Sequence, residues 1–137
     1  MDLKSVIRAA EKKNIAIGHF NVAETSVLKA IFESAKKIGV PVIIGTSEGE
    51  AGFLGRKQAA TLVQSLREEF KFPIFINSDH THSFEEVKKA VAAGYDAIGD
   101  QQGLCLAQHC YCLPYWARRG RGCSLRSPPQ SIGVVEA

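Results

Sequence analysis

Cysteine and tryptophan are absent from the first 100 residues of this 137-residue sequence. All four cysteines and the one tryptophan lie beyond residue 100, where lysine is absent in turn and Glu136 is the only acidic residue. The charge is split in the same way: residues 1–100 carry 13 basic and 13 acidic side chains, and residues 101–137 carry four arginines against that one glutamate. The composition therefore changes near residue 99, and the two parts require separate interpretations.

Long apolar runs are also absent. No stretch reaches the roughly 18 to 20 apolar residues that a membrane-spanning helix needs. The first residues, Met1 to Lys4, show neither the basic nor the apolar segment of a secretory signal. We therefore expect a cytoplasmic protein with no membrane partner. The 45% of hydrophobic residues is typical of a globular chain.

Stretches with helical periodicity alternate with short apolar runs. Apolar residues recur at helical spacing in residues 3–13, 24–38, 57–70 and 83–94. The apolar runs cover residues 15–22, 41–45, 73–76 and 95–98. Gly39 and Gly94 are typical of helix ends, and Ser83 followed by Glu86 predicts a capping box at a helix start.

The order of these elements predicts an α/β fold. Apolar runs without polar alternation indicate strands that are buried on both faces of a parallel sheet. Strand and helix units of this kind suit either a doubly wound sheet or a (β/α)8 barrel. In both folds the chemistry lies at the carboxyl ends of the strands, where Asn21 and the pairs Ser47-Glu48 and Asp79-His80 fall.

The pair Asp79-His80, just after the apolar run 73–76, is the sharpest candidate for a site. A neutral imidazole is a good zinc ligand, and a neighbouring carboxylate can move a proton of a substrate. Adjacent residues of an extended chain point to opposite sides, so both can serve one site only where the strand ends. The alternative is a set of polar caps before a helix, where Asp and Ser are common.

Three other positions permit a functional and a plainer interpretation. His82 is a second polar group at the same site or a surface histidine. His19 is a buried or barrel-lining histidine in preference to a metal ligand. The Ser47 hydroxyl and the backbone amides that follow could bind a phosphate, or they form an ordinary turn.

Residues 99–137 show no sustained helical or strand period, and Pro128-Pro129 breaks what pattern there is. The zinc-capable residues in this segment lack the paired spacing of structural zinc sites; they are His109, Cys110, Cys112 and Cys123. The arginines within 118–121 are typical of a solvated basic patch. We therefore expect an irregular, poorly ordered tail and no nucleic-acid partner.

Three motifs resemble the class II, zinc-dependent ketose-bisphosphate aldolases, which include the fructose- and tagatose-bisphosphate aldolases. The motifs are AIGHFNV, PVIIGTSEG and NSDHTHSFEEVKKAVAAGYDAI, and they occur in order within residues 3–98. The resemblance implies a Zn²⁺-dependent reversible cleavage of a ketose 1,6-bisphosphate to dihydroxyacetone phosphate and an aldehyde. It implies that Asp79 handles the hydroxyl proton of the aldehyde fragment and that His80 is a zinc ligand. It also implies that Asn21 and Ser47 line the dihydroxyacetone phosphate pocket, and that the intact enzyme is a homo-oligomer.

The resemblance stops near residue 98, where Gly99-Asp100-Gln101-Gln102 departs from the family pattern. We therefore expect residues 1–98 to form the amino-terminal portion, about three and a half βα units, of a (β/α)8 TIM barrel, whose full length is about 250 residues. A shift of reading frame would account for the unmatched segment 99–137. Such a chain should lack aldolase activity by itself.

A partial barrel of this kind should also expose surfaces that a closed barrel hides. We expect two open sheet edges and an inner face, with Ile17, Ile43 and Phe75, that has no partner. The alternative function is a non-enzymatic βα binding module whose Cys- and Arg-rich tail binds metal or nucleic acid. Deletion of residues 100–137 distinguishes the two, because only the binding module would lose its ligand.

Overall fold

The computed structural model describes residues 2–100, 103–106 and 135–136. The helices are α1 (Leu3–Lys13), α2 (Thr25–Ile38), α3 (Glu48–Leu54), α4 (Arg56–Phe70) and α5 (Phe84–Ala93). The strands are β1 (Gly18–Asn21), β2 (Val42–Thr46), β3 (Ile74–Ser78), β4 (Ala97–Asp100), β5 (Gly103–Leu106) and β6 (Val135–Glu136). The predicted alternation of helices and strands is confirmed, and each strand from β1 to β4 begins within an expected apolar run.

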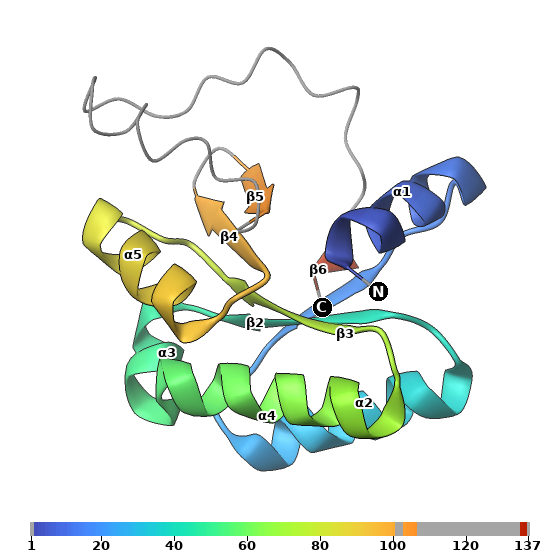
Figure 1. The fold of residues 1–137 in the computed structure, drawn as a ribbon, viewed down its shortest axis with the longest axis horizontal. Helices are drawn as coiled ribbons and strands as arrows, with labels where there is room; N and C mark the ends of the chain where they lie inside the picture. Colours follow the sequence, from blue (N-terminus) through green and yellow to red (C-terminus); the bar gives the residue numbers. More distant parts are fainter. Residues whose placement is uncertain (1, 101–102, 107–134, 137) are drawn as a thin grey trace.

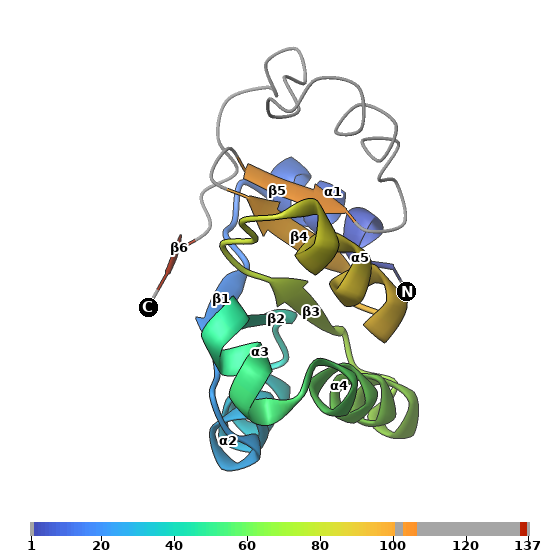
Figure 2. The same cartoon turned by 90° about the vertical axis from the view of Figure 1, so that its left-hand side faces the viewer.

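One sheet organises the molecule (Figure 1). Its strand order is β5-β4-β3-β2-β1-β6, and β1 to β4 pair in parallel. Helices α2 and α4 lie on one side of the sheet and α1 lies on the other, as two perpendicular views show (Figures 1 and 2). Parallel strands joined by helices are the βα units of a (β/α)8 barrel, so the predicted fold class is confirmed.

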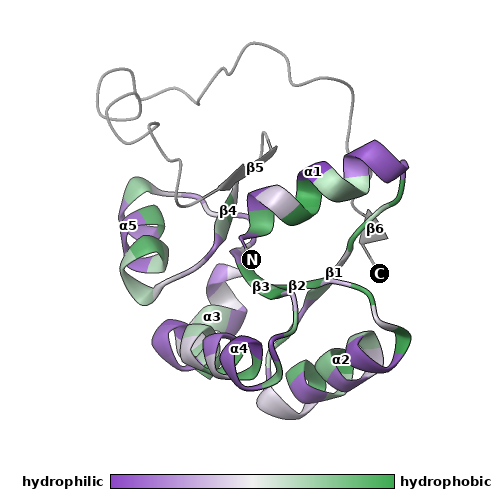
Figure 3. Cartoon of the chain, turned by 45° about the vertical axis from the view of Figure 1, so that its right-hand side comes forward, coloured by the Kyte–Doolittle hydropathy of each residue, from purple (hydrophilic) through white to green (hydrophobic). Residues whose placement is uncertain are grey.

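The outer face of the sheet packs against α2, α4 and α5. Residues at alternate positions of the strands point to this side, among them Ile44, Ile76 and Ile98. They meet the buried stripes of the helices, which include Phe32 of α2 and Val63 of α4. Figure 3 shows the same arrangement, with hydrophobic strands between helices whose outward sides are polar.

The inner face of the sheet is covered by α1, so the expectation that it has no partner is wrong. Ile17, Ile43 and Phe75 are only 4%, 2% and 0% exposed. They form a second core with three residues of α1, namely Leu3, Val6 and Ala10. The helical stripe of residues 3–13 was predicted, but its partner could not be, because the sheet exists only in the folded chain.

The two edges of the parallel sheet are also flanked by further strands. β5 pairs antiparallel with β4, and β6 pairs parallel with β1. Within the segment 99–137, residues 103–106 and 135–136 therefore form short strands. These strands are four and two residues long, too short for a period to be detected in the sequence. The expected tail features at His109, Cys110, Cys112, Cys123 and residues 118–121 lie outside the described residues.

Helix ends follow the predicted signals in most places. Gly39 and Gly94 end α2 and α5 with φ angles of 77° and 91°. The Ser83 side chain accepts a hydrogen bond from the Glu86 amide, as expected of a cap. The reciprocal half of the predicted capping box is replaced, because the Glu86 carboxylate binds Arg56 and Lys89.

Among the residues that the structure describes, α3 is the one helix that the periodicity did not predict. It has seven residues, two of which are glycines, so it carries neither a clear stripe nor a high helix propensity. Its start is fixed by a complete capping box between Ser47 and Glu50. In the part of the chain that the structure describes, no helix is both long and apolar enough to cross a membrane.

Two polar side chains satisfy backbone hydrogen-bonding groups in the first half of β3, before the point where β3 begins to pair with β4. Arg67 Nε donates to the Ile74 carbonyl at 2.7 Å, and Arg67 Nη1 donates to Asp96 Oδ1 at 3.0 Å. Asp96 Oδ2 in turn accepts from the Ile76 amide at 2.9 Å. The side chains thus pair backbone groups that would otherwise be buried without partners.

Candidate functional site

Polar side chains gather on the inner face of the sheet at the carboxyl ends of β1 and β3. Because successive residues of a strand point to opposite faces, His19 and Asn21 share one face of β1. Asn77 and Asp79 follow Phe75 at alternate positions of β3, and Phe75 belongs to the inner core. The strand pairing brings the two polar pairs together across Gly45 of β2.

Asp79 is held at three points. Its amide donates to the Thr46 carbonyl at 2.9 Å, which ties it to the end of β2. Its Oδ2 atom accepts from Asn21 Nδ2 at 3.0 Å and lies 3.5 Å from His80 Nε2. The carboxylate is 13% exposed, so a ligand can reach it while these contacts fix its orientation.

His80 turns out of the strand in the left-handed region, with a φ of 49°. This bend brings its imidazole beside the Asp79 carboxylate, as a shared site requires. The imidazole itself is 60% exposed. A left-handed conformation costs a non-glycine residue about 1–2 kcal/mol, so the surrounding structure must stabilise this turn.

Gly45 is what allows β1 to place its polar side chains over β2. A Cβ atom at this position would lie 2.1 Å from Asn21 Oδ1 and 2.6 Å from His19 Nε2. Both distances are far below van der Waals contact. The glycine therefore provides the space for the side chain that orients Asp79.

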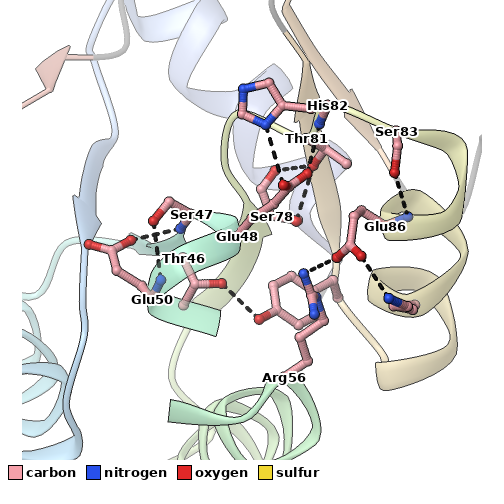
Figure 4. Close-up of polar contacts among 12 residues, drawn as sticks. Thr46, Ser47, Glu48, Glu50, Arg56, Ser78, Thr81, His82, Ser83 and Glu86 are labelled. Atoms are coloured by element: carbon pink, nitrogen blue, oxygen red, sulfur yellow. Dashed lines mark hydrogen bonds and ion pairs between the residues drawn. The ribbon is translucent and has the colours of Figure 1, made fainter. Parts of the chain in front are cut away.

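Ser47 follows β2 at the same carboxyl edge of the sheet, which we call the rim, and it caps the start of α3 (Figure 4). Its hydroxyl oxygen accepts from the Glu50 amide at 3.4 Å. Its own amide donates to Glu50 Oε2 at 2.7 Å and so is occupied within the capping box. The plainer interpretation, a local turn into a helix, accounts for these contacts. The hydroxyl proton remains available to donate.

His82 is an exposed histidine that links the loop after β3 to the start of α3 (Figure 4). Its amide donates to Glu48 Oε1 at 2.8 Å, and its Nδ1 lies 3.4 Å from Glu48 Oε2. The sequence placed Glu48 beside Ser47 at the end of a strand but did not indicate this contact. The contact holds the loop after β3 against the start of α3, so it stabilises the rim on which Asp79 and His80 lie.

His19 and Asn77 form a buried pair one layer below Asp79. His19 is 6% exposed, and its Nε2 lies 3.2 Å from Asn77 Nδ2. His19 is therefore the interior histidine that we expected. Asn77 was missed, although an amide at an inward position of an apolar run is a detectable signal.

A second cluster of polar side chains lies behind the rim, on the outer side of the sheet (Figure 4). Thr46 and Tyr95 share a hydrogen bond of 2.7 Å between β2 and the start of β4. Burial raises the pKa of Tyr95, against the opposing effects of that hydrogen bond and of Arg56. The hydrogen bond from Lys89 lowers the pKa of Glu86, which also pairs with Arg56. These groups join α4 and α5 and stabilise the rim from behind.

The described residues do not by themselves fit a zinc ion. Catalytic zinc usually has three protein ligands. Within the described ranges, no group of three or more His, Cys, Asp or Glu residues could hold a metal ion. Asp79 and His80 are brought together, whereas Ser47 is engaged at the helix start beside them.

The parallel sheet with α1 on its inner face and helices between its strands defines a portion of a (β/α)8 barrel. Residues 1–98 match the family model described as fructose-bisphosphate aldolase class-II. The chain belongs to this family. It is 34% identical over 101 residues to the probable fructose-bisphosphate aldolase of Bacillus subtilis, and 33% identical to the fructose-bisphosphate aldolase of Geobacillus stearothermophilus. Each match covers 72% of this chain and 35% of the relative.

Solved structures agree with the sequence relatives. The YdjI aldolase of Escherichia coli K12 superposes with a TM-score of 0.65 at 26% identity, covering 72% of this chain and 38% of that one. The fructose-bisphosphate aldolase of Campylobacter jejuni gives a TM-score of 0.57 at 27% identity, covering 66% and 29%. The chain thus spans about a third of the length of the relatives it matches.

Proposed function

We propose that residues 1–98 supply the proton-handling part of a class II aldolase site. The reaction is the zinc-dependent, reversible cleavage of a ketose 1,6-bisphosphate to dihydroxyacetone phosphate and an aldehyde. The observation that carries the proposal is the Asp79 carboxylate, which is oriented by Asn21 at 3.0 Å and anchored through its amide to Thr46. A positioned carboxylate of this kind is a general acid or base.

The contacts support a division of roles among these residues. Asn21 binds Asp79 Oδ2, so the other carboxylate oxygen is the one that meets a substrate hydroxyl. Ser47 and Asn21 are assigned to the dihydroxyacetone phosphate pocket. His80 would supply one zinc ligand, and the remaining ligands have to come from outside the described residues. We therefore expect the 137-residue chain to show no measurable cleavage of fructose or tagatose bisphosphate by itself.

A chimera tests the proposal directly. Residues 1–98 replace the matching segment of the Bacillus subtilis relative, and cleavage of fructose 1,6-bisphosphate is measured with and without zinc. We expect zinc-dependent cleavage, and we expect Asp79→Ala to lower kcat by about 10²- to 10⁴-fold. Glu33→Ala, on the exposed side of α2, is the matched control and should leave kcat unchanged.

Two results would contradict the proposal. The first is a chimera whose kcat is the same with and without the Asp79 carboxylate. The second is zinc-dependent turnover by the 137-residue chain alone that persists in both Asp79→Ala and His80→Ala, because the activity would then lie elsewhere.

A further inference from the structure

The loop between β3 and α5 is tied to both neighbouring strands through backbone atoms. The Asp79 amide donates to the Thr46 carbonyl of β2 at 2.9 Å, and the Thr81 amide donates to the Gly99 carbonyl of β4 at 2.9 Å. Because these two bonds join backbone to backbone, they do not depend on the side chains that the loop or its neighbours carry.

A side chain supplies a third tie. Glu48, the first residue of α3, accepts from the His82 amide through Oε1 at 2.8 Å, and its Oε2 lies 3.4 Å from His82 Nδ1 (Figure 4). Both carboxylate oxygens therefore meet the same loop residue, 34 positions further along the chain. This is the tie that a single substitution can remove while the backbone bonds stay.

Glu48 is not needed for the start of its own helix. The capping box of α3 is complete between Ser47 and Glu50, so the amides at the helix start do not depend on the Glu48 carboxylate. Its contacts with His82 instead serve the loop that carries Asp79 and His80.

We propose that Glu48 is a positioning residue, which holds the left-handed turn at His80 and so keeps the imidazole beside the Asp79 carboxylate. His80 has a φ of 49°, a conformation that a side chain disfavours. Such a turn persists only where the surrounding structure fixes the chain on both sides of it. Asp79 is fixed before the turn, and Thr81 and His82 are fixed after it. The catalytic consequence rests on the proposed function, whereas the hold on the turn does not.

A general stabilising contact accounts for less of the geometry. The Glu48 carboxylate is 30% exposed and the His82 imidazole 58% exposed, and ion pairs with this exposure contribute little to stability. A surface ion pair also gives no reason for a bond to the backbone. The bond to the His82 amide fixes the path of the chain two residues after His80.

Nuclear magnetic resonance on the isotope-labelled 137-residue chain tests this inference. A strong cross-peak between the His80 amide and its own Hα marks a positive φ, and amide hydrogen exchange reports the bond of His82. In Glu48→Ala we expect the His82 amide to exchange about two- to tenfold faster and the His80 cross-peak to weaken. Glu85→Ala removes an exposed carboxylate from the first turn of α5 and is the matched control, which should change neither signal.

Two further variants separate the amide bond from the ion pair. Glu48→Gln keeps an oxygen that accepts from the His82 amide, so it should retain both signals of the unaltered chain. His82→Ala removes the imidazole but keeps the amide, and it should also leave the His80 turn in place. An unchanged His80 cross-peak in Glu48→Ala would overturn the inference, even if its Tm fell. Equal losses in Glu48→Gln and Glu48→Ala would overturn it as well.

The chimera with the Bacillus subtilis relative provides the catalytic arm. There Glu48→Ala should lower kcat by up to about 10²-fold with a smaller change in KM, because Asp79 and His80 lose their relative placement. Glu48→Gln should restore most of this loss. Equal kcat in Glu48→Ala and Glu85→Ala would contradict the catalytic consequence. If no chimera cleaves the sugar, the proposed function fails, whereas the resonance measurements still decide whether Glu48 holds the turn.

Discussion

At the scale of single residues, the candidate site depends on a close approach of side chains to the backbone at one position and on a left-handed backbone conformation at another. Gly45 has no side chain where Asn21 and His19 cross it, and His80 bends the chain into the left-handed region. The first position sets the spacing of the inner polar layer. The second brings an imidazole and a carboxylate to the same side. Each supports a separate prediction.

Gly45→Ala should disturb the site and the fold together. Its Cβ atom would meet Asn21 Oδ1 at 2.1 Å, and overpacking of this kind costs about 1–3 kcal/mol. Urea unfolding measures the loss, and the Asn21 side-chain amide signal should move as Asn21 leaves Asp79. Gly52→Ala is the control, because its added Cβ meets nothing within 4 Å. Equal stability of the two variants would show that β1 and β2 are not packed as described.

His80→Gly should stabilise the chain while it removes the candidate zinc ligand. Glycine adopts a φ of 49° without the penalty that a side chain incurs, and about 0.5–1 kcal/mol should be gained. Lys71→Gly, at a φ of 50° at the end of α4, should give a similar gain with the imidazole intact. Thermal unfolding compares the two variants. A fall in Tm for His80→Gly alone would mean that the imidazole itself stabilises the loop.

At the scale of elements, side chains join strands and helices that the sheet alone leaves loosely tied. Arg67 and Asp96 complete the hydrogen bonds of β3, and Thr46 with Tyr95 links β2 to the start of β4. The Glu86 carboxylate pairs with Arg56 in place of the expected capping contact, and this pair joins α5 to α4. Each of these contacts crosses between two βα units and so holds neighbouring units together.

Tyr95→Phe should lower stability at neutral pH and flatten its decline at high pH. The loss of the hydrogen bond to the buried Thr46 hydroxyl should cost about 1–2 kcal/mol at pH 7. Burial raises the pKa of Tyr95, so the unfolded chain loses its phenol proton first, near pH 10. The free energy of unfolding therefore falls as the pH rises from about 10 through the raised pKa of the folded state.

Urea unfolding between pH 7 and 11 measures this difference. The unaltered chain should lose more stability than Tyr95→Phe above pH 10. Lysine deprotonation contributes equally to both chains and cancels in the comparison. Parallel curves over the whole range would show that the phenol titrates alike in the folded and unfolded states.

At the scale of the whole molecule, α1 decides whether this partial barrel can exist as a compact chain. It covers the inner core around Ile43 and Phe75, which in its absence would face solvent. β5 and β6 lie along the two edges that the parallel strands would otherwise leave open. Covered edges reduce the tendency of a sheet to pair with another chain.

Val6→Asp should uncover this inner core. Val6 is 8% exposed, and a charge buried there without a partner should cost at least about 3 kcal/mol, a large share of a domain's stability. We expect a lower Tm and association at size-exclusion chromatography. Ala9→Asp, on the exposed side of the same helix, should remain like the unaltered chain. A monomeric Val6→Asp with unchanged unfolding would show that α1 does not hold the inner face.

Particular positions show how much of the fold and of the candidate site could be predicted from the sequence. In the part of the chain that the structure describes, four of the five helices follow the apolar stripes, and strands β1 to β4 follow the apolar runs, because burial on both faces leaves a plain signal. The pair Asp79-His80 was detectable because polar residues end an apolar run. Asn77 was overlooked, and the contact of Glu48 was not predicted, because both depend on partners 58 and 34 residues away along the chain.

The sequence by itself determined the longer helices and strands β1 to β4, their order and the end of the sheet where the polar residues gather. It also determined the family, through three motifs within residues 3–98. The tertiary structure alone decided that α1 covers the inner face and that Asn21 orients Asp79 across Gly45. The same is true of the buried Asn77 side-chain oxygen, which has no hydrogen-bond partner among the described residues. The physical reason is that periodicity reports which face of an element is buried, whereas only the packed chain brings together the distant atoms that contact that face.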